Sequence, residues 1–179
     1  MSEPATTPSQ TIGPFLSIAL PWHDGPELVT SGGLTIVGTL TDGAGAPVPD
    51  GLVEIWQADP DGHFPHPADP HRADYAGLRP FGRCPSDADG AFRFRTVKPG
   101  RVDTEQAPHI DVVVFARGLL KHLVTRLYFP DEATANAADP VLQSLPADAR
   151  DRLVAVDDAD VLRFDIRLQG DGETPFFAV

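Results

Sequence analysis

Short segments in which apolar and polar residues alternate recur along this chain, and turn residues separate them. The clearest covers 161–168, where Leu162, Phe164, Ile166 and Leu168 share one face and charged residues share the other. Such alternation is typical of a strand with one buried face. The pattern predicts an all-β fold, a single-domain antiparallel β-sandwich of six or seven strands. The other strand segments are 34–40, 52–58, 91–97, 110–117 and 124–129, and short helices are expected at 131–138 and 147–154.

The composition limits the class of protein. With 179 residues, 41% of them hydrophobic, the chain is long enough for one packed domain. Its formal net charge of −12 argues against binding to nucleic acids or to anionic membranes, because both need basic patches. No run of about 18 apolar residues occurs, so no transmembrane helix is expected. Cys84 is the only cysteine, which excludes a disulfide within the chain and favours a reducing, cytoplasmic setting.

Residues 1–33 differ from the rest of the chain. They are rich in Pro, Ser, Thr and Gly and show no periodicity, so they are expected to form an extended arm. One interpretation is a frayed terminus. The other is an arm that packs on a partner subunit, because Ile12, Phe15 and Trp22 need a surface to cover them. The predicted organisation is therefore an N-terminal arm over 1–33 and a β-sandwich domain over 34–179.

A long stretch over 60–88 is expected to be irregular, and it contains candidate metal ligands. Their spacing matches no standard set of metal ligands. An exposed loop rich in proline also carries histidine for other reasons, so a metal site and a simple solvated loop both stay open. The residues concerned are His63, His66, His71, Asp61, Asp69 and Asp74.

The strand predicted over 110–117 carries the other polar candidates. Its alternation places His109, Asp111 and Arg117 on one face. With a second histidine such as His122, the pair His109 and Asp111 could form a two-histidine, one-carboxylate iron site and make the chain a self-sufficient metal enzyme. The alternative is a buried histidine hydrogen-bonded to a carboxylate. Arg117 is suited either to pair with Asp111 or to bind an anionic ligand.

Glu54 is a charged residue inside a predicted strand, between Val53 and Ile55. A glutamate at such a position either holds a neighbouring loop or arginine, or takes part in function. The structural role is the one expected here.

Several motifs together resemble the intradiol ring-cleavage dioxygenase family, and they cover most of the chain. The resemblance implies a β-sandwich that binds non-haem Fe(III) through two tyrosinates and two histidines, and that opens an aromatic ring with O₂. The motifs are Ile36-x-Gly38-x-Leu40, Val53-Glu54-Ile55, Gly62-x-Phe64, 87–94, Val97-Lys98-Pro99-Gly100, Ala107-Pro108-His109-Ile110, 125–129 and 163–166.

The resemblance assigns the four iron ligands to Phe64, Val102, His109 and Asp111, so three of the four expected side chains are absent. Only two tyrosines, Tyr75 and Tyr128, occur in the chain, and neither falls at a ligand position. The resemblance therefore implies a subunit that binds no metal itself. The Fe(III) would be held by a homologous partner chain, the β subunit of an αβ protomer.

The resemblance also implies where this chain meets the substrate. Thr11, Gly13 and Pro14 of the arm and Arg117 after the strand would face the partner's iron. Arg117 would bind the carboxylate of a small aromatic substrate. At Phe15 the family usually has Tyr, so the hydroxyl group is missing here. A transthyretin-like sandwich that only binds a small molecule or a protein remains a rival, but it gives no reason for the motifs at 11–15 and 115–118.

Overall fold

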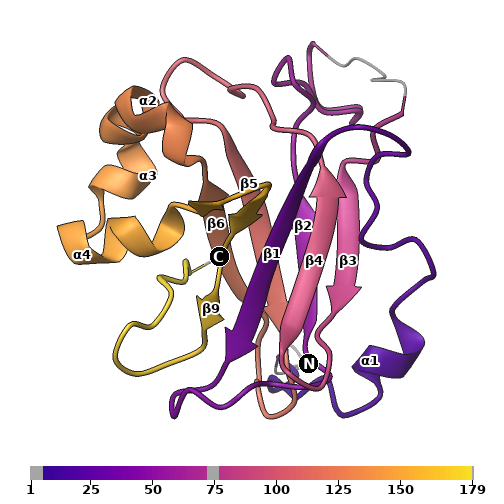
Figure 1. Ribbon diagram of the computed structural model, residues 1–179. Coiled ribbons are helices and arrows are strands. Elements are labelled where there is room, and N and C mark those ends of the chain that lie inside the picture. Colours follow the sequence, from indigo (N-terminus) through magenta and orange to yellow (C-terminus); the bar gives the residue numbers. More distant parts are fainter. Residues whose placement is uncertain (1–5, 72–76, 179) are drawn as a thin grey trace, which may run out of the picture.

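Two facing β-sheets make up most of the regular structure in the computed structural model, which describes residues 6–71 and 77–178 (Figure 1). In the first sheet the strand order is β4 (Ala91–Thr96), β1 (Leu34–Thr41), β8 (Val161–Arg163) and β7 (Val156–Asp158), and β9 (Ile166–Arg167) also pairs with β1. In the second sheet the order is β3 (Phe81–Pro85), β2 (Leu52–Trp56), β5 (His109–Phe115) and β6 (Leu123–Tyr128).

The core lies between the two sheets and is built from alternate positions of their strands. Ile110, Val112 and Val114 of β5 are buried there, opposite residues such as Ile36 and Phe94 of the first sheet. Removal of these apolar side chains from water is the main force that holds the sheets together. The predicted all-β sandwich is therefore confirmed.

The first sheet is mixed rather than purely antiparallel. Strands β8 and β9 both run parallel to β1. The single strand predicted over 161–168 is divided into these two, because the Asp165 carboxylate accepts the hydrogen bond of the Thr39 amide at 2.9 Å. The predicted inner face is still correct, since Phe164 and Ile166 are buried.

Two strands fall where the sequence predicted none. Strand β3 lies inside the stretch over 60–88 that was expected to be irregular, and β7 precedes β8. The described residues thus contain nine strands, more than the predicted six or seven. The alternation of β3 is hidden because Gly82 occupies one inner position, where Leu28 packs so closely that a Cβ atom would lie 2.4 Å from its side chain.

Short helices between β6 and β7 lie beside the second sheet (Figure 1). Under them Tyr128, Leu142 and Leu153 form a small second core with Ala107. Both predicted helical segments are present, and one more short helix lies between them. The elements are η1 (Pro130–Glu132), α2 (Ala133–Ala138), α3 (Pro140–Gln143), α4 (Ala147–Arg150) and η2 (Asp151–Leu153).

The N-terminal region is only partly an extended arm. A short helix, α1 (Leu16–Ala19), stands apart from the sheets, and the chain then runs back to β1 (Figure 1). Within this return, Leu28 and Val29 are buried in the chain's own core. Before it, Phe15 and Ile18 are 71% and 76% exposed. Packing of the arm on a partner stays a prediction, and it concerns mainly the segment up to α1.

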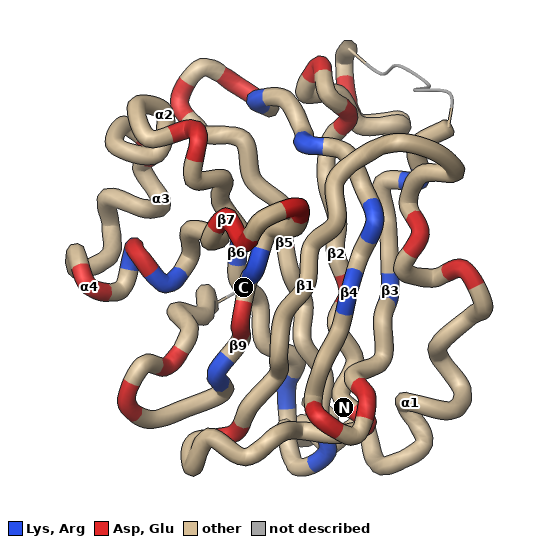
Figure 2. The backbone as a smooth tube through the Cα atoms, viewed as in Figure 1, with Lys and Arg blue, Asp and Glu red and all other residues tan. Residues whose placement is uncertain are grey.

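Acidic residues occur on many loops of the view in Figure 2, whereas lysine and arginine positions include strands β3 and β4. Among the described residues, no helix has the length and apolar character needed to cross a membrane.

Candidate functional site

The outer face of the second sheet, the side turned away from the core, carries a row of polar and aromatic side chains. The strand register sets Trp56 opposite Asp111, and Asp111 opposite Arg126. Alternation requires this arrangement, because Ile110, Val112 and Val114 already point into the core. The row includes His109 and Asp111, which the sequence placed on one face.

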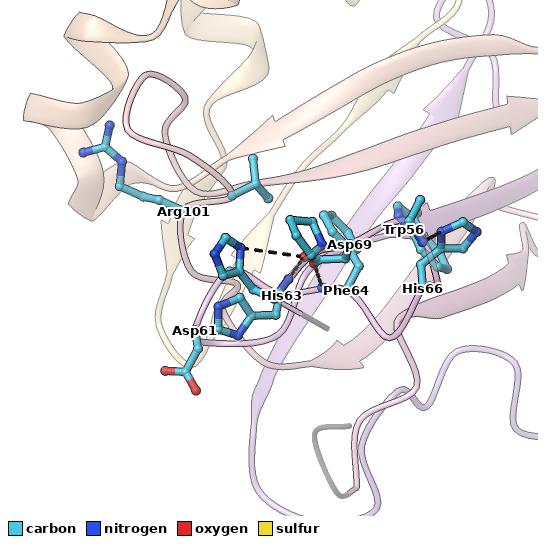
Figure 3. Close-up of a pocket in the computed structure, with 12 residues that line it drawn as sticks. Trp56, Asp61, His63, Phe64, His66, Asp69 and Arg101 are labelled. Atoms are coloured by element: carbon cyan, nitrogen blue, oxygen red, sulfur yellow. Dashed lines mark hydrogen bonds and ion pairs between the residues drawn. The ribbon is translucent and has the colours of Figure 1, made fainter. Parts of the chain in front are cut away.

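Phe64 and Val102, the positions where the resemblance placed two tyrosine ligands, line one cavity of about 790 Å³ beside this row. The ring of Phe64 stacks on Trp56, with 5.7 Å between centroids and 1° between planes. Figure 3 shows His63, Phe64 and Asp69 gathered together and the guanidinium of Arg101 directed away from them. That guanidinium donates hydrogen bonds to the carbonyl oxygens of two nearby loop residues. Phe64 and Val102 thus line the same cavity as Trp56, Asp111 lies opposite Trp56 on β5, and His109 lies two residues before Asp111.

Of the four positions to which the resemblance assigns iron ligands, only His109 has the expected side chain, and it is almost completely buried. Its Nδ1 lies 2.8 Å from the Ala107 carbonyl oxygen, and its Nε2 lies 3.9 Å from Oδ1 of Asp111. Burial lowers the pKa of His109, so the ring is a neutral imidazole near neutral pH. The histidine is buried, as one of the two alternatives expected, but its hydrogen bond goes to the Ala107 carbonyl oxygen and not to a carboxylate, because Asp111 lies too far away at 3.9 Å.

Asp111 is already paired with a cation. Arg126 Nε donates to its Oδ1 at 3.0 Å, and the Arg126 Nη1 donates to Oε1 of Gln106 at 2.8 Å. The sequence interpretation that Arg117 pairs with Asp111 is wrong, because β5 ends at Phe115 and Arg117 lies beyond it. Asp111 pairs instead with Arg126, which lies directly opposite it on β6.

These residues do not fit a ferric site with two phenolate ligands. Phe64 and Val102 have no side-chain donor atom, and the Asp111 carboxylate is occupied by a guanidinium. His122 does not join His109 either. Its ring packs on Phe115 at 5.6 Å between centroids, at the opposite end of β5. The set His109, Asp111 and His122 is therefore not assembled in this chain.

The histidine-rich loop is held by ordinary hydrogen bonds. Asp69 accepts from the backbone amides of Phe64 and His71 at 2.7 and 2.8 Å, and these bonds lower the pKa of the Asp69 carboxyl. His63 stacks on His71 at 5.8 Å. Over residues 6–71 and 77–178, no three or more His, Cys, Asp and Glu side chains are grouped to hold a metal ion. Asp74 and Tyr75 lie outside the described residues.

Tyr128, the other tyrosine, does not face the cavity. Its side chain is fully buried, and its hydroxyl donates to Oδ1 of Asp139 at 3.3 Å. Burial raises the pKa of Tyr128 to about 12, so the phenol stays protonated at neutral pH. Tyr128 is part of the small core under α3.

The predicted substrate contacts lie around a different hollow, at the other end of β5. Gln10 and Ile12 of the arm line a cavity of about 670 Å³ together with Phe115 and Ala116. The structure therefore brings the arm segment that holds Thr11 and Gly13 to the strand end that precedes Arg117. Thr11 and Pro14 are exposed.

Arg117 has a partner that the sequence did not reveal. Its Nε lies 3.2 Å from Oδ2 of Asp50, and its side chain is 57% exposed. Asp50 adopts a positive φ of 58°, at the turn that leads into β2. Only Nε is held, so the two terminal nitrogens of the guanidinium point to no acceptor among the described residues.

The two places are far apart on the same strand. His109 and Phe115 begin and end β5, which at about 3.4 Å per residue places them roughly 20 Å apart. One small substrate cannot touch both ends. Sequence reasoning did not identify four residues of these two places, namely Trp56, Gln106, Arg126 and Asp50. Only the alternation around Trp56 and Arg126 could have indicated that these two side chains share the outer face of the second sheet.

The comparisons with known proteins agree with this architecture. Residues 22–170 match the dioxygenase family. The chain therefore belongs to the intradiol ring-cleavage dioxygenase family, as its motifs predicted.

Within this family, the chain is similar to the protocatechuate 3,4-dioxygenase alpha chain of Burkholderia cepacia, with 42% identity over 97% of each chain. It is also similar to the beta chain of the same organism's enzyme, with 36% identity over 79% of this chain and 66% of that one. Among solved structures, the dioxygenase domain of a carbohydrate-binding fusion protein from Streptomyces sp. SirexAA-E matches with a TM-score of 0.58 and 29% identity, covering 93% of this chain and 99% of that one.

Proposed function

We propose that this chain is the α subunit of a protocatechuate 3,4-dioxygenase, the subunit that binds no iron. With a β subunit that carries Fe(III), it would convert protocatechuate and O₂ to 3-carboxy-cis,cis-muconate in the cytoplasmic breakdown of aromatic compounds. The near full-length similarity to alpha chains supports this proposal. So does the replacement of ligand positions by Phe64 and Val102, which offer no donor atom.

The observation that carries the proposal is the separation of the two sites along β5. Arg117 and the arm lie at one end, whereas the ligand positions that the resemblance assigns on β5, Asp111 and His109, lie roughly 14 and 20 Å from Phe115. Substrate held by Arg117 must therefore meet a metal that another chain supplies. This arrangement supports a shared pocket between two subunits.

The surface around the arm is suited to such a partner. Ile12 and Leu120, 42% and 62% exposed, line the cavity at the end of β5, and the still more exposed Phe15 and Ile18 follow along the arm. Leu16 between them is buried against this chain. The arm thus turns one apolar side inward and leaves another to be covered, as is typical of a subunit interface.

At this interface the chain's own residues would bind and orient the substrate. Arg117 offers the terminal edge of its guanidinium, which matches the two oxygens of a carboxylate. Asp50 holds Nε and so limits how the side chain can turn. Thr11, Gly13 and Pro14 would form the wall on the arm side.

The test is reconstitution. The isolated chain should contain no stoichiometric iron by metal analysis and show no ring cleavage. Activity, followed as O₂ uptake and loss of protocatechuate, should appear after addition of a homologous iron-bearing β chain. Stoichiometric iron in the chain alone, or turnover without β, would contradict the proposal.

Deletion of residues 1–15 tests the arm separately. We expect it to weaken assembly with β or to raise KM, because it removes Thr11, Gly13 and Pro14. Arg163→Ala, which changes an exposed ion pair on the other sheet, serves as the control. Normal assembly and kinetics after the deletion would show that the arm is only a tail.

A further inference from the structure

We propose that Trp22, Glu54 and Arg83, together called the arm anchor, are positioning residues that hold the N-terminal arm where its residues 11–14 reach the shared pocket. This inference rests on the proposed function and extends it to residues that do not touch the substrate. It is carried by contacts that fasten the arm to the outer face of the second sheet.

Arg83 links the sheet to the arm. It lies on β3 opposite Glu54 of β2, and its Nε donates to Glu54 Oε1 at 2.6 Å, while Nη2 contacts the same oxygen. Its Nη1 donates to the carbonyl oxygen of Leu20 at 2.9 Å. The side chains of Arg83 and Glu54 are only 19% and 13% exposed, so water competes weakly for these bonds.

Trp22, which belongs to the arm, packs against Arg83 and its neighbours. Its ring stacks on Phe81 with 5.9 Å between centroids. The guanidinium carbons of Arg83 and Arg79 lie 5.1 and 5.5 Å from the Trp22 centroid, within the range of cation–π attraction. Glu54, which the sequence expected to hold a loop or an arginine, is found to hold Arg83.

The backbone confirms that the arm lies close to β3 here. The Arg83 amide donates to the Gly25 carbonyl oxygen at 3.0 Å. A Cβ atom on Gly25 would lie 2.4 Å from the Arg83 carbonyl oxygen, so only glycine allows this approach. The anchor therefore fixes both the main chain and the side chains of this part of the arm.

The contact of Arg83 with Leu20 also restrains the residues on the N-terminal side of Leu20, through the hydrogen bonds of α1. Leu20 follows α1 directly, and its amide donates to the Leu16 carbonyl oxygen. The amides of Ile18 and Ala19 donate to the carbonyl oxygen of Phe15. The position of Leu20 thus determines where Phe15 lies, and Pro14 precedes it. At the far side the arm reaches the cavity at the end of β5 through Gln10 and Ile12.

The test compares variants of the anchor in the assembled αβ enzyme. Arg83→Lys keeps the charge but loses the fork that joins Glu54 to Leu20, and Trp22→Leu removes the ring. We expect KM for protocatechuate to rise roughly tenfold in each variant, which corresponds to ~1.4 kcal/mol of binding free energy. We expect kcat to change less than about twofold, because the arm anchor positions substrate contacts and does not itself touch the substrate. Arg93→Ala is the matched control, because Arg93 pairs with Glu27 of the arm but is 58% exposed.

A second measurement uses the isolated chain. Hydrogen exchange of the amides over residues 15–20 should speed up in Arg83→Lys and Trp22→Leu but not in Arg93→Ala. A lower melting temperature with unchanged KM and unchanged exchange in that segment would overturn the proposal, as would a fall in kcat alone. If the wild-type chain fails to form an active enzyme with β, the proposed function fails, and the exchange measurement still decides whether the anchor holds the arm.

Discussion

Replacement of Arg117 by alanine tests the substrate contact most directly. The side chain follows β5, stands 57% exposed and is held only at Nε, by Asp50. If its terminal nitrogens bind the carboxylate of protocatechuate, Arg117→Ala removes that contact while leaving the strand and the core intact. We expect KM to rise and kcat to change little, because the carboxylate is remote from the bonds that react.

The structure sets the size of this effect. A hydrogen bond to a charged group contributes about 1.5–3 kcal/mol, and the lower end applies because the guanidinium is more than half exposed in this chain. That value corresponds to roughly a tenfold rise in KM. Loss of the exposed pair with Asp50 costs less than about 1 kcal/mol of unfolding free energy, so the variant should fold and assemble normally.

Steady-state kinetics of the reconstituted enzyme measure the change. Arg117→Lys should fall between wild type and alanine, since it keeps the charge but lacks the planar fork. The substrate analogue catechol, which has no carboxylate, should show no difference between wild type and Arg117→Ala. A KM for protocatechuate within twofold of wild type would refute the assigned role, and so would an equal loss with catechol.

Two further predictions concern the small core under α3. Because burial raises the pKa of Tyr128 to about 12, against 10.0 in the unfolded chain, the free energy of unfolding should fall by about 2 kcal/mol as the pH rises from 10 to 12. Urea titrations should show this loss in wild type and a smaller one in Tyr128→Phe; equal losses would contradict it. Asp139→Ala should cost roughly 3–5 kcal/mol, because the buried amides of Ala107 and Leu142 and the partly buried amide of Val141 lose their acceptor. The exposed Asp131→Ala should change stability by less than about 0.5 kcal/mol, and a similar loss in both variants would refute the reasoning.

The strands could be predicted where each has one buried face. The alternation in 34–40 and 91–97 marks β1 and β4 to within a residue. Strand β3 escaped because Gly82 contributes no side chain to its inner face. The division between β8 and β9 was not predicted either, because it depends on the hydrogen bond between Asp165 and Thr39, which is 126 residues away in the chain.

The candidate sites divide in the same way. The absence of donor atoms at Phe64 and Val102 can be read from residue types once the motifs are aligned. The pairing of Asp111 with Arg126 cannot, because it requires the register of β5 against β6. The anchor likewise joins Trp22, Glu54 and Arg83, which lie in three separate parts of the chain.

The sequence by itself determined that this chain folds as a β-sandwich of the intradiol family and that it lacks the phenol oxygens of a ferric site. The β-sandwich follows from the alternation of residues, the family from the resemblance of its motifs, and the missing phenol oxygens from the residue types at the positions that this resemblance assigns. Only the tertiary structure decided that the arm and Arg117 lie at one end of β5 and the ligand positions at the other. Distance and neighbourhood arise from strand pairing between remote segments, and no single stretch of sequence contains that information.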